Sequence, residues 1–237
     1  MVTNMQKQLN NNGLQFPQTN VSRVGRNIYF TGEISEDSTH ELIRILAEIE
    51  AEDDEQKPQE KIEVLINDFM TVDDMKKKNK FDAKNLYEEL DDSIDMYNSD
   101  SSLDREPIHL HISSRGGDLE ESIGVTEVIK NMKTPVWAYT YKAYSGAFLI
   151  FVACDRRFMY QNGTLLYHQL TTGNYGKLAD LIDDVNESIR LQEVMEDIVL
   201  DCTGITEDKL EEVRILKQDW ILTSEEAIDW KIVDEII

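Results

Sequence analysis

The sequence predicts an α/β protein with a mostly parallel sheet, and three observations carry that prediction. Short β-branched or aromatic segments alternate with longer amphipathic segments along most of the 237 residues. Turn residues, above all glycine and proline, separate neighbouring segments. The length is sufficient for one sizeable core, or for a core with one appended lobe. Successive β-α-β units of this kind form parallel sheets with right-handed crossovers.

Composition and charge exclude several kinds of partner. The formal net charge is -23 at pH 7, whereas binding to nucleic acid or to an anionic membrane needs clustered Lys and Arg. The longest apolar run, Gly146 to Cys154, is too short to cross a membrane. The first twenty residues are rich in amide side chains and lack the apolar centre of a secretion signal. We therefore expect a cytoplasmic protein that contacts neither nucleic acid nor membrane.

The composition divides the chain into a leader, a domain and an insertion. Residues 1–25 predict a flexible leader, and the folded domain is expected over residues 26–237. Within that domain, residues 51–106 are acid-rich and poor in aromatic side chains. A surface insertion explains this composition, because long surface loops cost little closure entropy. A docking or gating lobe is the alternative, and the sequence leaves both open.

The segments on either side of the insertion predict β-α units. The predicted elements are a strand over 26–35, a helix capped by Ser38 or Thr39, a strand over 108–112, a tight turn over 113–118, a helix over 119–132 and a strand over 136–140. His109 and His111 share one face of their predicted strand. Because they have no acidic or cysteine companions at ligand spacing, we predict no metal site.

A long helix is the main feature of the C-terminal third. From about Lys177 to Cys202, apolar residues recur every three or four positions. At 1.5 Å per residue such a helix is about 39 Å long, more than a compact domain of this size spans. We expect a projecting arm that packs against another subunit, and a surface helix along its own domain is the alternative. Further on, Thr223 and Glu226 form a capping-box pattern for a last short helix.

Five residues provide the groups that acyl transfer requires. Ser145 begins the apolar run, and a serine hydroxyl needs a neighbouring base, an orienting acid and oxyanion donors to act as a nucleophile. His168 follows a predicted strand and is the candidate base. Asp219 lies in an otherwise apolar turn, where a lone carboxylate is costly without a partner, so it is the candidate orienting acid. The N–H groups of Gly117 and Gly146 are the candidate oxyanion donors.

Several stretches carry a family resemblance, in order and at similar spacing. They are RNIYFTGEISEDSTHELI, IHLHISSRGGDLEESIGVTEVIKNMKTPV, AYSGAFLIFVACDRRFMYQNGTLLYHQ, the long helix ending in CTG, and KQDWILTSEEAIDWKIVDEI. Together they resemble the proteolytic subunit of the ATP-dependent Clp protease and, more distantly, signal peptide peptidase A. The resemblance covers the chain from Arg26 to the C-terminus, except for the acid-rich insertion.

That resemblance implies a crotonase-like, ClpP-like fold of stacked β-α units with a long projecting handle helix. It implies Ser145, His168 and Asp219 as nucleophile, base and orienting acid, with Gly117 and Gly146 as the oxyanion donors. Protein or peptide substrates, homo-oligomeric rings and a partner AAA+ unfoldase follow from the family, and no cofactor does. The expected function is therefore serine endopeptidase activity inside a ring assembly.

Three departures from the family's motifs bear on that expectation. Arg115 replaces the proline of the S-P-G-G turn, and Lys231 replaces a glycine of the closing motif. The family's S-M-G-A is here Tyr144-Ser145-Gly-Ala, and a match on Gly-Ala-Phe would put Tyr144 at the nucleophile position. One residue on a helix is a rotation of about 100°, so the two registers cannot both aim a hydroxyl at the base. We take Ser145 as the nucleophile, and a catalytically inactive ring subunit with a structural or adaptor role is the alternative.

Overall fold

The computed structural model describes residues 20–55 and 105–237. Most of the predicted leader over 1–25 and of the predicted insertion over 51–106 lies outside these residues. Two parts of those segments are described. Residues 51–55 continue a helix that spans 36–55, and residues 21–24 form a strand.

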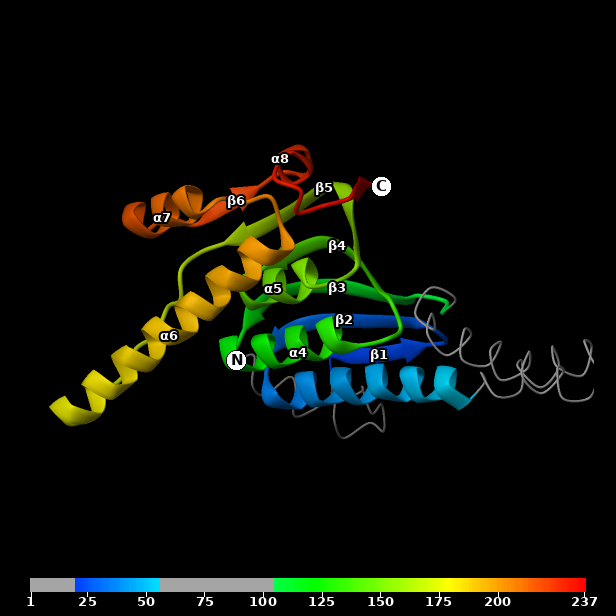
Figure 1. Cartoon of the computed structure of the whole chain (residues 1–237), viewed down its shortest axis with the longest axis horizontal. Coiled ribbons are helices and arrows are strands. Elements are labelled where there is room, and N and C mark those ends of the chain that lie inside the picture. The colour runs from blue at the N-terminus through cyan, green and yellow to red at the C-terminus, as the bar shows by residue number, and fades with distance from the viewer. Residues whose placement is uncertain (1–19, 56–104) are drawn as a thin grey trace, which may run out of the picture.

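One mixed sheet organises the described residues (Figure 1). Its strands are β1 (Val21–Val24), β2 (Asn27–Ile34), β3 (Ile108–Gly117), β4 (Val136–Tyr144), β5 (Arg156–Tyr167), β6 (Trp220–Leu222) and β7 (Glu235–Ile236). They are ordered β1-β2-β3-β4-β5-β6, with β7 paired to β5. The pairs from β2 to β5 are parallel, whereas β1 and β6 are antiparallel to their neighbours. The predicted α/β class with a mostly parallel sheet is confirmed.

Besides the helix over 36–55, five helices are described. They are α4 (Leu119–Asn131), α5 (Gly146–Val152), α6 (Leu178–Cys202), α7 (Glu207–Leu216) and α8 (Ser224–Asp229). Figure 1 shows α5 lying between the sheet and α4, while α6 projects away from the body of the domain. The last helix begins with the predicted capping box, in which Thr223 and Glu226 each bond the other's backbone N–H. None of these helices is long and apolar enough to cross a membrane.

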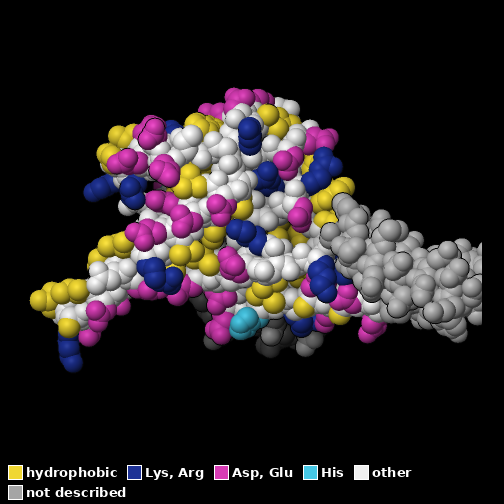
Figure 2. All heavy atoms as spheres, in the orientation of Figure 1, with side chains coloured by type: hydrophobic (Ala, Val, Ile, Leu, Met, Phe, Trp, Pro, Cys, Tyr) yellow, Lys and Arg dark blue, Asp and Glu magenta, His cyan; other side chains and the backbone are white. Residues whose placement is uncertain are grey.

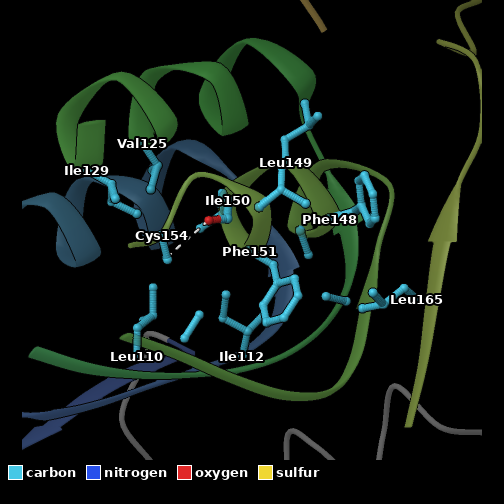
Figure 3. Packing of buried hydrophobic residues seen from close by; sticks show 14 of the residues in the cluster. Leu110, Ile112, Val125, Ile129, Phe148, Leu149, Ile150, Phe151, Cys154 and Leu165 are labelled. Atoms are coloured by element: carbon cyan, nitrogen blue, oxygen red, sulfur yellow. Dashed lines mark hydrogen bonds between the residues drawn. The ribbon is translucent and has the colours of Figure 1, made fainter. Parts of the chain in front are cut away.

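Helix α5 is the centre of the hydrophobic core. All seven of its residues are buried, because the sheet covers one side and α4 covers another (Figure 3), while α6 also contacts it. Phe148 and Phe151 are its largest side chains, and both are fully buried. Just beyond its end, the Cys154 thiol lies 3.3 Å from the carbonyl oxygen of Ile150. Burial raises the pKa of Cys154 well above its ordinary value, so this thiol is unreactive in the folded protein.

Three strands extend further than the sequence predicts. The segment predicted as a tight turn over 113–118 is mostly strand, because β3 continues to Gly117. Strand β4 continues to Tyr144, past its predicted end at residue 140, and the strand predicted before His168 is the end of β5, which is 12 residues long. The longer strands bring β4 directly to the first residue of α5, with no loop between them.

Two arginines connect the end of the first described range, at residue 55, to the start of the second, at residue 105. Arg26 pairs with Asp53 at 2.7 Å, and Arg105 pairs with Asp54 at 2.5 Å. Arg105 is buried and also donates a hydrogen bond of 3.1 Å to Thr134. Charge-assisted bonds of this kind are short and strong. They hold the end of the helix over 36–55 next to residue 105, where the described chain resumes.

We expect Phe151→Ala to destabilise the fold by about 3–5 kcal/mol, because the ring is fully buried between the sheet and α4. Urea denaturation followed by circular dichroism measures the change. Phe158, which lies on the opposite face of the sheet, is the matched control, and Phe158→Ala should cost clearly less. Equal losses for the two variants would contradict the central place of α5 in the core.

Candidate active site

Ser145 lies at the junction of β4 and α5 in a strained backbone conformation. Its φ is 54° and its ψ is -126°, a region that residues with a side chain rarely occupy. Its N–H donates to the carbonyl oxygen of Leu166 at 2.9 Å, and its carbonyl oxygen accepts from Phe148 at 2.8 Å. In α/β-hydrolases, a serine held in a sharp strand-to-helix turn exposes its nucleophilic hydroxyl.

The sheet register brings the predicted base and acid to the same edge as Ser145. Tyr144 of β4 pairs with Leu166 of the parallel strand β5, so Ser145 and His168 follow the carboxyl ends of neighbouring strands. Tyr167 pairs with Trp220 of the antiparallel strand β6. His168 therefore leaves the sheet opposite the point where Asp219 enters it.

The structure does not join His168 to Asp219. Nδ1 of His168 lies 2.6 Å from the carbonyl oxygen of its own neighbour, Gln169. Asp219 is exposed, and no hydrogen bond or ion pair to its carboxylate is found among residues 20–55 and 105–237. The expectation that this carboxylate is desolvated and needs a partner is wrong, because water solvates it.

Two glycines pack against the Ser145 turn, and neither has room for a side chain. A Cβ on Gly116 would lie 2.8 Å from the Cβ of Ser145 and 3.0 Å from the backbone nitrogen of Gly146. Gly116 also has a φ of 93°, which favours glycine. A Cβ on Gly146 would overlap the hydroxyl of Ser122 on α4. The glycine turn of β3 is thus in contact with the peptide that joins Ser145 to Gly146.

Gly117, the other predicted oxyanion donor, is next to this contact. It pairs with Ile34 of β2, and the following N–H, of Asp118, donates to the Ile34 carbonyl oxygen at 3.0 Å. Successive N–H groups of a strand point to opposite sides. The Gly117 N–H is therefore expected to point away from β2, toward the side on which Ser145 lies. Sequence reasoning missed Gly116 and Ser122, although the adjacent glycines were a signal for a close approach of two backbones.

The structure also shows how the chain reaches Ser145 rather than Tyr144 at the turn. The register of β4 on β3 shifts because Ile112 pairs with Thr140 while Ser113 pairs with Lys142, so Tyr141 is an extra residue in a bulge. Tyr144 is still in the sheet, and its hydroxyl is 2.9 Å from that of Thr164 on β5. The strained position between strand and helix thus belongs to Ser145.

The other two departures have local explanations. Arg115 is exposed and is the extra residue of a second bulge, because Ser114 pairs with Gly32 while Gly116 pairs with Glu33. Lys231 has a φ of 53°, a conformation that glycine adopts without cost and that costs other residues about 1 kcal/mol or more. The positive φ at this position explains why the family's motif has glycine there. In this chain Lys231 adopts the same conformation at that cost in free energy.

His109 and His111 belong to a row of rings on the face of the sheet opposite α5. Tyr29, His111, Tyr139 and Phe158 stack in succession, with ring centroids 4.8, 4.9 and 4.7 Å apart. Nδ1 of His109 is 3.0 Å from the Tyr139 hydroxyl, and Nε2 of His111 is 3.1 Å from the side-chain oxygen of Asn27. Burial and the neighbouring His109 lower the pKa of His111. Both rings are thus occupied by contacts within the protein.

Comparisons with known proteins show which sequences and structures this chain resembles. A family model described as Clp protease matches residues 86–237. The ATP-dependent Clp protease proteolytic subunit 3 of Rhizobium johnstonii is 32% identical over 136 residues, which are 56% of this chain and 69% of that protein. The ATP-dependent Clp protease proteolytic subunit of Deinococcus radiodurans is 25% identical over 141 residues, 58% of this chain and 68% of that protein.

One solved structure extends the comparison to the fold. A ClpP1 mutant from Listeria monocytogenes superposes with a TM-score of 0.59 at 20% identity, covering 90% of this chain and 91% of its own. At that identity the likeness speaks for the fold alone, which is the crotonase-like, ClpP-like fold that the sequence predicts.

We expect Gly146→Ala to destabilise the protein by about 1–3 kcal/mol, because the added methyl group overlaps the Ser122 side chain. Combining it with Ser122→Gly removes the overlap and should recover most of that loss in a double-mutant cycle measured by urea denaturation. Gly124→Ala on α4 is the control, since a Cβ there meets nothing within 4 Å. Additive effects of the two substitutions would contradict the packing described here.

Proposed function

The chain belongs to the Clp protease family, and from that premise we propose that it is a serine endopeptidase with Ser145 as nucleophile, His168 as base and Asp219 as orienting acid. The observation that carries the proposal is the strained Ser145 backbone at a sheet edge that also carries the other two residues. Strain of this kind costs of order 1–3 kcal/mol and is concentrated at active sites.

The proposed reaction proceeds through an acyl-enzyme. Nε2 of His168 takes the proton of the Ser145 hydroxyl as Oγ attacks the peptide carbonyl carbon. The N–H groups of Gly117 and Gly146 donate hydrogen bonds to the resulting oxyanion. His168 then gives the proton to the leaving amine as the carbon–nitrogen bond breaks. In the second half, His168 takes a proton from water as the water attacks the ester carbonyl carbon, and returns it to Ser145 Oγ as the ester bond breaks.

The orienting step requires His168 to exchange one hydrogen bond for another. Its Nδ1–H now points to the Gln169 carbonyl oxygen, and in the reactive arrangement it would donate to Asp219. The register of Tyr167 on Trp220 supports this exchange, because His168 and Asp219 are the next residues beyond that pair. A turn of the imidazole about its own side-chain bonds is therefore the movement that we propose.

The second candidate function is a non-catalytic ring subunit. Two observations favour it. The Asp219 carboxylate has no partner in the part of the chain that the structure describes, and His168 bonds Gln169, so a permanently separated pair would have no orienting acid. In this case the chain would contribute structure or a docking surface to an assembly.

Both candidates include self-assembly into rings, for which α6 provides support. Four apolar residues on one side of its projecting part are more than half exposed, namely Leu178, Ile182, Val185 and Ile189. Figure 2 shows hydrophobic side chains at the projecting end of α6. An exposed apolar stripe on a soluble monomer is typical of a protein–protein interface. We propose that this stripe packs against another copy of the chain.

The names of the relatives describe subunits of an ATP-dependent protease. We therefore propose an AAA+ unfoldase as partner, protein or peptide substrates and a cytoplasmic location. Tyr29, which ends the row of stacked rings, is exposed and supports the first of these, since it offers aromatic surface to a docking segment.

A fluorophosphonate probe tests the catalytic proposal. The assembled protein should be labelled at Ser145, and Ser145→Ala should abolish labelling. His168→Ala should slow it by about 1,000-fold or more, because the base and the nucleophile act as a unit. Tyr144→Phe removes the neighbouring hydroxyl and should leave labelling unchanged. An assembled particle that the probe does not label would support the non-catalytic subunit instead.

Introducing a charge into the apolar stripe tests the assembly. Ile182→Glu and Ile189→Glu place carboxylates in the proposed interface and should reduce the mass of the particle in analytical ultracentrifugation, because a buried unpaired charge is costly. Asp183→Asn, next to Ile182 but outside the stripe, is the control and should assemble normally. A particle of unchanged mass in both glutamate variants would remove α6 from the interface.

A further inference from the structure

A chain of polar side chains links the segment after His168 to α6 and α7. The backbone N–H of Leu170 donates to Oε1 of Gln192 at 2.7 Å. Nε2 of Gln192 donates to Oε1 of Glu196 at 2.8 Å, and Nη1 of Arg214 is 3.5 Å from Oε2 of the same carboxylate. We call these four residues, Leu170, Gln192, Glu196 and Arg214, the polar bridge.

The polar bridge supports a segment that has no other backbone support. In the described chain, no backbone N–H or C=O of residues 168–176 is hydrogen-bonded to another backbone group. His168 is next to Tyr167, whose backbone is held by the sheet, and two residues before Leu170. The stretch from His168 to Leu170 is thus held by β5 before His168 and by Gln192 at Leu170.

The polar bridge is shielded enough for its hydrogen bonds to matter. The Glu196 side chain is only 15% exposed, and Gln192 is half-buried. The nearby Tyr167 side chain is buried, and burial together with the Glu196 carboxylate raises the pKa of its phenol. A hydrogen bond lost in such surroundings leaves a polar group without water to replace its partner.

Position 192 has a specific chemical requirement. Its side chain must accept from the Leu170 N–H and at the same time donate to the Glu196 carboxylate. A primary amide does both, whereas a carboxylate only accepts and an ammonium group only donates. Glutamine satisfies the requirement, and the Glu196 carboxylate in turn receives the charge of Arg214.

We propose that Gln192 is a positioning residue for His168, which holds the segment after β5 so that the imidazole reaches the Ser145 hydroxyl. The inference rests on the proposed serine peptidase function. Arg214 lies on α7, the helix that precedes Asp219, so the polar bridge also joins the supports of the base and of the acid. Gln192 itself does not touch the reacting atoms.

Exchanging the side chains of Gln192 and Glu196 tests this role on the full-length assembled protein. Gln192→Leu should lower the maximal rate of fluorophosphonate labelling by about tenfold or more, the equivalent of one buried hydrogen bond, with an unchanged half-saturating probe concentration. Gln192→Glu should lose as much, because two carboxylates then face each other. In the double variant Q192E/E196Q, donor and acceptor exchange places, so the bonds from the Leu170 N–H and between positions 192 and 196 re-form. Arg214 then donates to an amide oxygen, and the rate should return to within about threefold of wild type.

Matched controls separate positioning from general stability. Glu193→Gln changes the adjacent, exposed position of α6 and should label as wild type does. The thermal midpoints of all variants are measured beside the rates. Wild-type labelling by Gln192→Leu, a double variant no better than its parents, or a loss that appears only in the half-saturating concentration would each overturn the proposal.

A second readout does not depend on catalysis. The imidazole signals of His168, assigned by their absence in His168→Gln, should shift in the NMR spectrum of Gln192→Leu and return in the swapped variant. If the fluorophosphonate probe does not label the wild-type protein but the imidazole signals shift and return in this way, the proposed function is refuted and the positioning role remains. Unshifted signals would overturn the positioning role whether or not the wild type is labelled.

Discussion

The direct passage from β4 into a fully buried helix is the constraint on which the rest of the structure depends. Helix α5 is apolar on all sides and must lie between the sheet and α4, while β4 stays in the sheet until Tyr144. One residue has to turn the chain from one layer into the next. That residue is Ser145, and the tight approach of Gly116 and Gly146 follows from the absence of space around it.

The sheet then determines which other residues reach this edge. Parallel pairing of β4 with β5 brings His168 next to the turn, and antiparallel pairing of β5 with β6 brings Asp219 next to His168. Many backbone hydrogen bonds support these positions. The direction of the imidazole, in contrast, depends on one or two bonds, and an exposed ion pair contributes only about 0–1 kcal/mol. The backbone register alone therefore does not determine the partner of the imidazole, which in the structure is the carbonyl oxygen of Gln169.

The same difference explains how far the sequence could predict the fold and the site. The apolar run of α5, the periodicity of α6 and the capping box at Thr223 are local patterns, and the structure has each of them close to the predicted bounds. The lengths of β3 and β4 depend on partners far along the chain, and both were underestimated. Ser122 and Gln192 carry no local signal, because their roles arise only when α4 meets α5 and when α6 meets the segment after β5.

The side chain at position 145 distinguishes the two candidate functions better than the backbone does. A sharp turn into α5 is needed whether or not the protein is an enzyme, and a glycine would make that turn at lower cost. Lys217 also has a positive φ, but its ψ of 44° places it in the left-handed helical region, which side chains tolerate. Ser145, with a ψ of -126°, is outside that region. A scaffold gains nothing from a Cβ and a hydroxyl at such a position, whereas a peptidase needs both, so the serine itself favours the catalytic function.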